Sequence, residues 1–184
     1  MVDTKLILLA VVIILGLIYA GLYNKIINAK NRCDNAWQTI DTQLQRRLDL
    51  IPNLVETVKG YAAHESDTLK AVTQARSQAA NATTPEAKME ADTALTGALR
   101  HLFAVAEAYP DLKANTNFLQ MQSDLSDTEN RISYARMSFN DCVLNYNNAI
   151  ETFPGNIVAS IGHFQTKTGF EAEQNARQAP SVKF

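Results

Sequence analysis

The stretch that decides the fold is residues 118–153, FLQMQSDLSDTENRISYARMSFNDCVLNYNNAIETF. A large side chain recurs there at every seventh position. Four positions before each following large side chain stands a member of a second set, which shares the same helix face. This spacing keeps one face of a helix turned toward partner helices. The segment therefore predicts a long helix, which Pro154-Gly155 should end. The large members are Phe118, Leu125, Ile132, Phe139, Tyr146 and Phe153, and the second set is Met121, Thr128, Ala135, Cys142 and Ala149.

A second helix is predicted upstream of this segment. Thr84-Pro85 provides a hydroxyl cap followed by proline at the first helical position, where the missing amide has no partner to lose. Tyr109-Pro110-Asp111 should close the helix. Its predicted buried stripe consists of Ala91, Leu95, Ala98, Leu102, Val105 and Tyr109.

Residues 25–80 also carry an apolar stripe with steps of three or four residues. Pro52 lies in the middle of it, and proline removes one amide and crowds the preceding turn. The surrounding residues are too apolar for an exposed turn, so we predict one long helix kinked at Pro52. Two helices divided at Pro52 are the alternative. Asn81–Thr84 is predicted to be a loop.

The N-terminus is predicted to be a membrane anchor. Residues 6–22 read LILLAVVIILGLIYAGL, and the nineteen uncharged positions between Lys5 and Lys25 span roughly 30 Å as a helix, about the thickness of the hydrocarbon core. Tyr19 and Tyr23 lie at the end of the stretch, where aromatic rings favour the headgroup level. The alternative is a cleaved signal peptide, whose apolar region usually has only about 7–15 residues.

Basic residues after the apolar stretch predict its orientation. Lys25, Lys30 and Arg32 follow it, whereas Lys5 and the amino terminus precede it. The excess of cations predicts that the C-terminal domain lies on the cytoplasmic side of the membrane. These three residues are also predicted to contact anionic lipid headgroups, although they could simply flank the span. The two cysteines fit a reducing compartment.

The predicted architecture is all-α. A transmembrane helix at residues 1–24 continues without a linker into a long antiparallel bundle of three to four helices at residues 25–171, and residues 172–184 form a polar tail. The net charge of −2 lacks the basic surplus of a nucleic-acid binder. Only seven glycines occur, and no glycine-rich phosphate loop is present in the sequence.

No motif in the sequence indicates catalysis. His64-Glu65 lacks the second histidine of a zinc-protease helix, and no Glu-x-x-His pair of a di-iron bundle occurs. Cys33 and Cys142 have no local partner for a nucleophilic role. We therefore predict a protein without enzymatic activity and without a cofactor or metal, with a dispersed metal site as the alternative.

Polar residues in the run Arg46–Glu65 exceed what a bundle core requires. One arginine of Arg46-Arg47 adjoins the apolar stripe, and Glu129 flanks the stripe of the last helix. A buried or half-buried Arg–Glu pair between these helices is predicted, and two exposed arginines are the alternative. The run is also the predicted partner or assembly surface, formed by Arg46, Arg47, Asn53, Lys59, Tyr61, His64 and Glu65.

Several strings of this sequence closely resemble the signature of the bacterial LemA family. The most specific is Ile51–Glu65, IPNLVETVKGYAAHE, and the resemblance extends from about Tyr23 to Glu171. It implies a membrane-anchored four-helix bundle with a single N-terminal span, and it brings no catalytic residues. Further matching strings are Ala36-Trp37, Ala75–Ser77, Ala108–Ala114, Asn117–Leu119, Glu129–Ile132, Phe139-Asn140, Tyr146-Asn147 and Phe153-Pro154.

The resemblance also bears on partners. Relatives are found near genes for TPM-domain membrane proteins and a membrane zinc metalloprotease, and some occur among magnetosome membrane components. The sequence predicts a single-pass membrane scaffold or adaptor that assembles with itself at the bilayer. The alternative is an accessory subunit of a membrane protease or another membrane complex. A hydrolase or metalloprotein is a third, weaker hypothesis.

Overall fold

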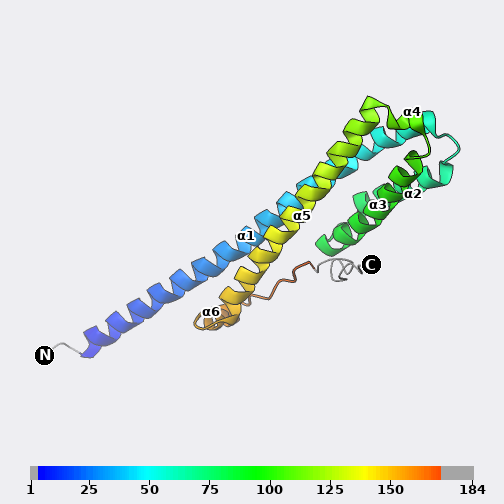
Figure 1. Ribbon diagram of the computed structural model, residues 1–184. Helices are drawn as coiled ribbons and strands as arrows, with labels where there is room; N and C mark the ends of the chain where they lie inside the picture. The colour runs from blue at the N-terminus through cyan, green and yellow to red at the C-terminus, as the bar shows by residue number, and fades with distance from the viewer. Residues whose placement is uncertain (1–3, 171–184) are drawn as a thin grey trace, which may run out of the picture. The chain divides into compact units, whose positions relative to one another are not determined.

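The computed structural model describes residues 4–170, and no β-strand occurs in that range (Figure 1). The all-α prediction is therefore confirmed. The predicted tail, residues 172–184, lies outside the described residues. The helices are α1 (Thr4–Tyr61), α2 (Ser66–Asn81), α3 (Pro85–Ala106), α4 (Pro110–Lys113), α5 (Thr116–Glu151) and α6 (Gly155–Ile161).

The chain forms two compact units, and both α1 and α5 contribute to each of them. Residues 37–135 make up the first, here called the bundle unit. The second combines the start of the chain through Ala36 with the residues from Arg136 onward, and is here called the anchor unit. The predicted boundaries at residues 24 and 171 refer to the membrane and the tail, and they stay predictions.

The bundle unit contains five helical segments, from α1 to α5, around one hydrophobic core. Short connections join α1 to α2 and α2 to α3, so that consecutive helices reverse direction (Figure 1). Each large side chain buried in such a core contributes roughly 1.5–3 kcal/mol. The core includes Ile51, Leu54 and Val58 of α1, Leu69 and Val72 of α2, Leu95 and Leu102 of α3, Leu112 of α4, and Phe118 and Leu125 of α5.

Helix α1 passes through Pro52 without ending, so the predicted alternative of two helices divided there is wrong. Pro52 is exposed, and its ring nitrogen cannot donate to the carbonyl of Leu48 one turn earlier. Arg76 of α2 supplies the missing donor, because its Nε bonds the Leu48 carbonyl oxygen at 3.1 Å. The guanidinium therefore satisfies the backbone group that proline leaves unpaired.

A double-mutant cycle tests this explanation. Arg76→Leu should lower the free energy of unfolding by about 1.5–3 kcal/mol, because a charged donor is lost from the Leu48 carbonyl. In a Pro52→Ala background the same change should cost less, since the restored amide bonds that carbonyl. Urea unfolding of the four proteins measures the difference. Equal costs in both backgrounds would show that Arg76 acts elsewhere.

A turn at Ala62–Glu65 ends α1, so the prediction of one helix through residue 80 is also wrong. The Glu65 amide donates to the Ala62 carbonyl at 3.0 Å, which closes the turn. Ala62 is buried and holds the turn against the core. No large apolar side chain occurs between Ala62 and Leu69, and this gap marks where the stripe is interrupted.

Helix α3 begins as predicted. The Ala87 amide donates to Thr84 Oγ1 at 3.2 Å, and Pro85 occupies the first position. The helix ends at Ala106, before the predicted Tyr109. Of the predicted stripe, Leu95 and Leu102 are buried and the other members are half-buried. The buried face is rotated slightly, and it also includes Met89, Asp92, Thr96, Leu99 and Ala106.

Helix α5 confirms the predicted seven-residue stripe as far as Tyr146, with Phe118, Leu125, Ile132, Phe139 and Tyr146 buried. Beyond Phe139 the buried positions become Val143, Tyr146 and Ile150, because a straight helix drifts away from a strict heptad. Phe153 was predicted to be a member but is 79% exposed, since the helix has already ended at Glu151.

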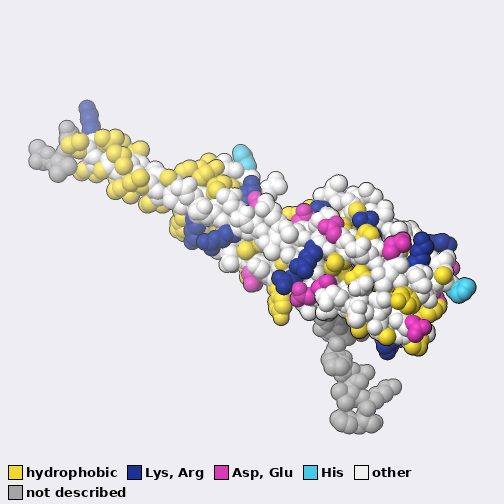
Figure 2. All heavy atoms as spheres, turned by 90° about the horizontal axis from the view of Figure 1, so that it is seen from above, with side chains coloured by type: hydrophobic (Ala, Val, Ile, Leu, Met, Phe, Trp, Pro, Cys, Tyr) yellow, Lys and Arg dark blue, Asp and Glu magenta, His cyan; other side chains and the backbone are white. Residues whose placement is uncertain are grey.

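The anchor unit holds the apolar part of α1. Its large apolar side chains from Leu6 to Ile18 are about half exposed or more, and Figure 2 shows them in yellow along the start of the helix. This stretch is long and apolar enough to cross a membrane, which fits membrane attachment. It leads directly into the rest of α1, so the predicted absence of a linker is confirmed.

Residues 163–170, here called the strap, run back along α5 in extended form after α6. His163 has a φ of 54°, which turns the chain at the start of the strap. Asn147 bonds the backbone of Lys167 through both amide atoms at 2.9 Å. Asn140, two turns earlier on α5, bonds the backbone of Phe170 in the same way at 2.9 and 2.8 Å.

Side chains reinforce the strap. Tyr146 donates its hydroxyl to the Gln165 carbonyl at 2.9 Å, and Lys167 Nζ lies 2.6 Å from an Asp34 carboxylate oxygen. The Phe170 ring packs on Phe139 with centroids 5.0 Å apart.

A candidate partner surface and a buried ion-pair network

Arg47 is the centre of a buried ion-pair network in the bundle unit. Its residue is 2% exposed, and its Nη1 lies 2.8 Å from an Asp92 carboxylate oxygen. Its Nη2 lies 3.6 Å from Glu129, whose other oxygen is 3.5 Å from Arg100. Three helices, α1, α3 and α5, therefore meet through one guanidinium.

The predicted Arg–Glu pair between the first and last helices is confirmed by this geometry. Arg47 is the arginine that lies inside, and Arg46 is exposed. Arg131, two residues after Glu129, bonds Asp127 at 2.8 Å on the surface of α5. The alternative of two exposed arginines is wrong for Arg47.

Sequence reasoning missed Asp92. This carboxylate is 6% exposed and is the nearest counter-charge to Arg47. Its position three residues before Leu95 puts it on the buried face of α3, which was the available signal. A buried charge needs a partner, so an aspartate on that face points to a buried cation.

We expect the network to fix how the three helices align more than to add stability. Burying two charges costs desolvation energy that their attraction only partly returns. A single guanidinium that must reach Asp92 and Glu129 together nevertheless disfavours any shifted register. The Arg47 Nε has no hydrogen-bond partner within residues 4–170, so the site is not fully satisfied.

The turn between α1 and α2 forms a polar corner. Tyr109 donates its hydroxyl to Glu65 Oε1 at 2.9 Å, and this bond to a carboxylate raises the pKa of the tyrosine. Asn115 donates to the Tyr61 hydroxyl at 3.0 Å and also accepts from the Phe118 amide at the start of α5. The corner is thus tied to the chain on either side of α4.

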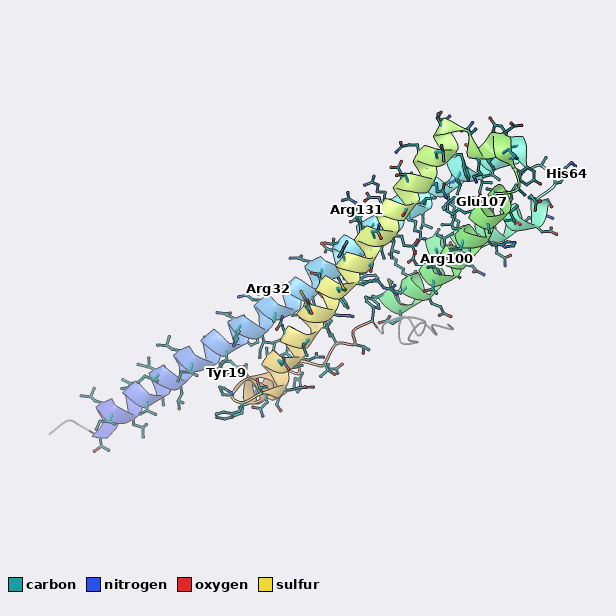
Figure 3. The ribbon with its side chains drawn as sticks, in the orientation of Figure 1. Tyr19, Arg32, His64, Arg100, Glu107 and Arg131 are labelled. Carbon is teal, nitrogen blue, oxygen red and sulfur yellow. The ribbon has the colours of Figure 1, made fainter. Side chains whose placement is uncertain are left out.

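Most of the predicted partner surface is exposed in this structure. Glu65 is half-buried by Tyr109, whereas Arg47 is buried and therefore serves helix packing. Figure 3 labels His64 in the turn between α1 and α2. The exposed members are Arg46, Asn53, Lys59, Tyr61 and His64.

A shallow groove lies next to this surface, between the end of α1 and α2. Its volume is about 580 Å³. Val55 and Leu69 contribute apolar walls, and Glu56, Lys59 and Lys70 bring charges of both signs. Lys59 therefore borders a concave surface, which the amino-acid sequence alone does not reveal.

The described part of the chain offers no arrangement for metal chemistry. Between residues 4 and 170, no three His, Cys, Asp or Glu side chains are placed to hold one ion. Cys33 is buried, and burial, with a smaller effect of the nearby Cys142, raises the pKa of its thiol. A raised pKa keeps the thiol protonated at neutral pH, unlike an activated nucleophile.

The predicted lipid-facing cations lie in the anchor unit. Lys25, Lys30 and Arg32 are all exposed on α1 (Arg32 is labelled in Figure 3). Lys25 and Arg32 line a groove of about 700 Å³ between α1 and α5, whereas Lys30 does not. Their contact with lipid stays a prediction.

Comparison with known proteins identifies the family. The sequence pattern of the LemA family matches residues 36–184. Protein LemA of Metamycoplasma hominis is 31% identical over 165 residues, which cover 87% of this chain and 74% of that protein. Magnetosome protein MamQ of Magnetospirillum gryphiswaldense is 26% identical over 86% of this chain and 66% of its own length.

A further relative is Magnetosome protein MamQ 2 of Paramagnetospirillum magneticum, 24% identical over 87% of this chain and 68% of that protein. None of these three names is that of an enzyme. The family match covers the whole bundle unit and all described residues of α5, α6 and the strap. The chain belongs to the LemA family.

Proposed function

We propose that this protein is a membrane-anchored scaffold or adaptor without enzymatic activity, and that it assembles with further copies of itself at the bilayer. The observation that carries the proposal is the groove beside the exposed surface around Lys59. It belongs to a chain whose first helix also holds an apolar stretch fit for a membrane. The family relationship supports a membrane-associated helical protein.

A second copy is the proposed occupant of the groove. Its rim carries Glu56 together with Lys59 and Lys70, so it has charges of both signs. The same patch on another copy, turned by a two-fold rotation, can complement it. Attachment to one membrane confines the copies to two dimensions and raises their local concentration.

The proposed location is the inner membrane of a bacterium, with the bundle unit on the cytoplasmic side. The excess of cations after the apolar stretch supports this orientation. The competing role is an accessory subunit of a membrane protease, including partners of the TPM-domain or metalloprotease type. Both roles require an exposed docking surface, so the identity of the crosslinked partner separates them.

Crosslinking in native membranes, followed by mass spectrometry, tests the proposal. Alanine variants of Arg46, Asn53 and Lys59 should lose the crosslinked homo-oligomer while circular dichroism stays unchanged, because these side chains are exposed. Arg131→Ala is the matched control, since Arg131 is exposed on α5 and its only ion pair within residues 4–170 is with Asp127.

Two results would contradict self-assembly through this surface. The first is an unchanged crosslinking pattern in all three variants. The second is a dominant crosslink to a membrane protease in place of a second copy, which would establish the accessory role instead. Retention of the protein in the same membranes after carbonate extraction checks the anchor. The mass of the mature chain shows whether a signal peptide has been cleaved.

A further inference from the structure

The end of α5 and helix α6 expose an apolar surface in the anchor unit. Phe153 is 79% exposed, Ile157 53% and Ile161 61%, although each could have been a polar residue at no cost to packing. Ile157 and Ile161 lie one turn apart on α6, so they share a face. No charged residue occurs from Thr152 to Gly162. We call Phe153, Ile157 and Ile161 the α6 corner.

The opposite side of α6 explains why the segment folds there. Val158 and Ala159 are buried, and they hold the helix against the anchor unit. Gly155 is required at its start, because a Cβ there would lie 2.1 Å from the Ala149 carbonyl oxygen. The exposed face is therefore presented by a firmly packed turn, and its apolar side chains are not needed to bury the helix.

The α6 corner lies level with the end of the apolar stretch of α1. Phe164 follows α6 directly, and its amide bonds the Ala159 carbonyl at 3.0 Å. The Phe164 ring contacts the Tyr23 ring with centroids 5.6 Å apart, and Tyr23 stacks on Tyr19 at 6.2 Å. Tyr23 comes one residue after Leu22, where the apolar stretch ends. Tyr19 is labelled in Figure 3.

A polar groove adjoins the corner on the same end of the unit. Lys25 and Arg32 line it together with Asn24, Asn28, Asn145, Asn148 and Thr152, in a volume of about 700 Å³. No carboxylate lines it. Within residues 4–170 neither Lys25 nor Arg32 has an ion-pair partner. Cations surrounded by amides are the chemistry that binds phosphate oxygens.

We propose that the α6 corner and this groove form a second membrane contact, specific for anionic phospholipids. The corner inserts Phe153, Ile157 and Ile161 to the depth of the acyl boundary, and the groove receives a lipid phosphate between Lys25 and Arg32. Apolar side chains next to cations suit a bilayer surface, where acyl chains adjoin anionic headgroups. The inference rests on the proposed membrane attachment, and it adds a second contact and a lipid class.

Depth-dependent fluorescence quenching tests the corner. The full chain carrying Ile161→Trp is reconstituted in phosphatidylcholine–phosphatidylglycerol vesicles whose acyl chains are brominated. The new fluorescence should be quenched by about half, since interfacial side chains reach roughly 5–10 Å into the boundary. Leu119→Trp, at an exposed apolar position of the bundle unit, should stay unquenched, as should the parent protein with Trp37 alone.

The outcomes distinguish this inference from the anchor itself. If Ile161→Trp escapes quenching while the protein still floats with the vesicles, the second contact is overturned and the anchor stands. If the protein does not float, the proposed membrane attachment fails as well. Quenching of Leu119→Trp to the same degree would also overturn the inference, because the contact would then not be confined to the corner.

Thermal unfolding in mixed micelles tests the groove. Phosphatidylglycerol should raise the melting temperature of the native protein, and the double variant Lys25→Gln/Arg32→Gln should lose this shift. Arg131→Gln is the matched control, because Arg131 is an exposed cation of the bundle unit outside the groove, and it should keep the shift. An equal shift in the double variant, or an equal shift from inorganic phosphate alone, would overturn the assignment to lipid.

Discussion

Arg47→Ala is expected to destabilise the protein by about 3–5 kcal/mol, because it leaves Asp92 buried without its counter-charge. Glu129 is half exposed and can be hydrated instead, so most of the loss should come from Asp92. Urea unfolding followed by far-ultraviolet circular dichroism in detergent measures the effect.

The neighbouring arginine is the control. Arg46 is exposed, so Arg46→Ala should change the stability by less than about 0.5 kcal/mol. A double replacement, Arg47→Met with Asp92→Leu, should recover most of the loss, since apolar residues of similar size often replace buried ion pairs without cost. Equal effects of Arg46→Ala and Arg47→Ala would contradict the network.

The strap is expected to detach when its two asparagine clamps are removed. Asn140→Ala and Asn147→Ala each eliminate two hydrogen bonds to the strap backbone, at about 1 kcal/mol per bond. The double variant should expose Lys167 to trypsin at least about tenfold faster, because local opening becomes easier. Mass spectrometry of the digest locates the cleavage.

Asn145→Ala supplies the comparison for the strap. Asn145 is exposed on the same helix, and its side chain forms no hydrogen bond with the described residues of the strap. Its substitution should leave both the melting temperature and cleavage after Lys167 unchanged. If the double clamp variant were cut no faster than Asn145→Ala, the other contacts of the strap, through Tyr146, Phe170 and the Asp34 ion pair, would suffice to hold it.

Sequence periodicity predicted the buried faces of the bundle because burial itself is periodic on a helix. The stripes of α1 and α5 followed from side-chain spacing, and the Thr84 cap followed from local hydrogen-bond chemistry. The strict heptad failed only near its end. There the intrinsic helical period moved the buried face to Val143 and Ile150, and the helix ended before Phe153.

Contacts between distant residues could not be read from the sequence. Pro52 is accommodated by an arginine 24 positions later, whose role depends on how α2 packs on α1. The strap is held through its backbone, which bonds asparagine side chains 20 and 30 residues earlier. Such contacts need no regular spacing of apolar side chains, so the strap shows no apolar periodicity. Phe139-Asn140 and Tyr146-Asn147 belong to the strings that resemble the LemA family. Their spacing does not indicate that the two asparagines bond the backbone of the strap.

The candidate site was predicted in part. Charge next to an apolar stripe pointed correctly to Arg47 and Glu129, since a charge near a buried face needs a partner. Asp92 was missed because a single carboxylate among apolar residues gives no indication of which cation it meets. The grooves beside Lys59 and between Lys25 and Arg32 depend on how two helices diverge, and side-chain spacing along one helix does not determine that.

The anchor unit combines an early and a late part of the chain, and this has a consequence for biosynthesis. Its strap joins Asp34 to Lys167, positions 133 residues apart, whereas the bundle unit is complete once residue 135 has been made. The bundle unit can therefore fold before the anchor unit is complete, and the anchor unit closes only after the strap has emerged from the ribosome. A chain that terminates between residues 136 and 162 should have a folded bundle unit and an anchor unit without its strap. Quality-control proteases at the membrane should recognise such a chain.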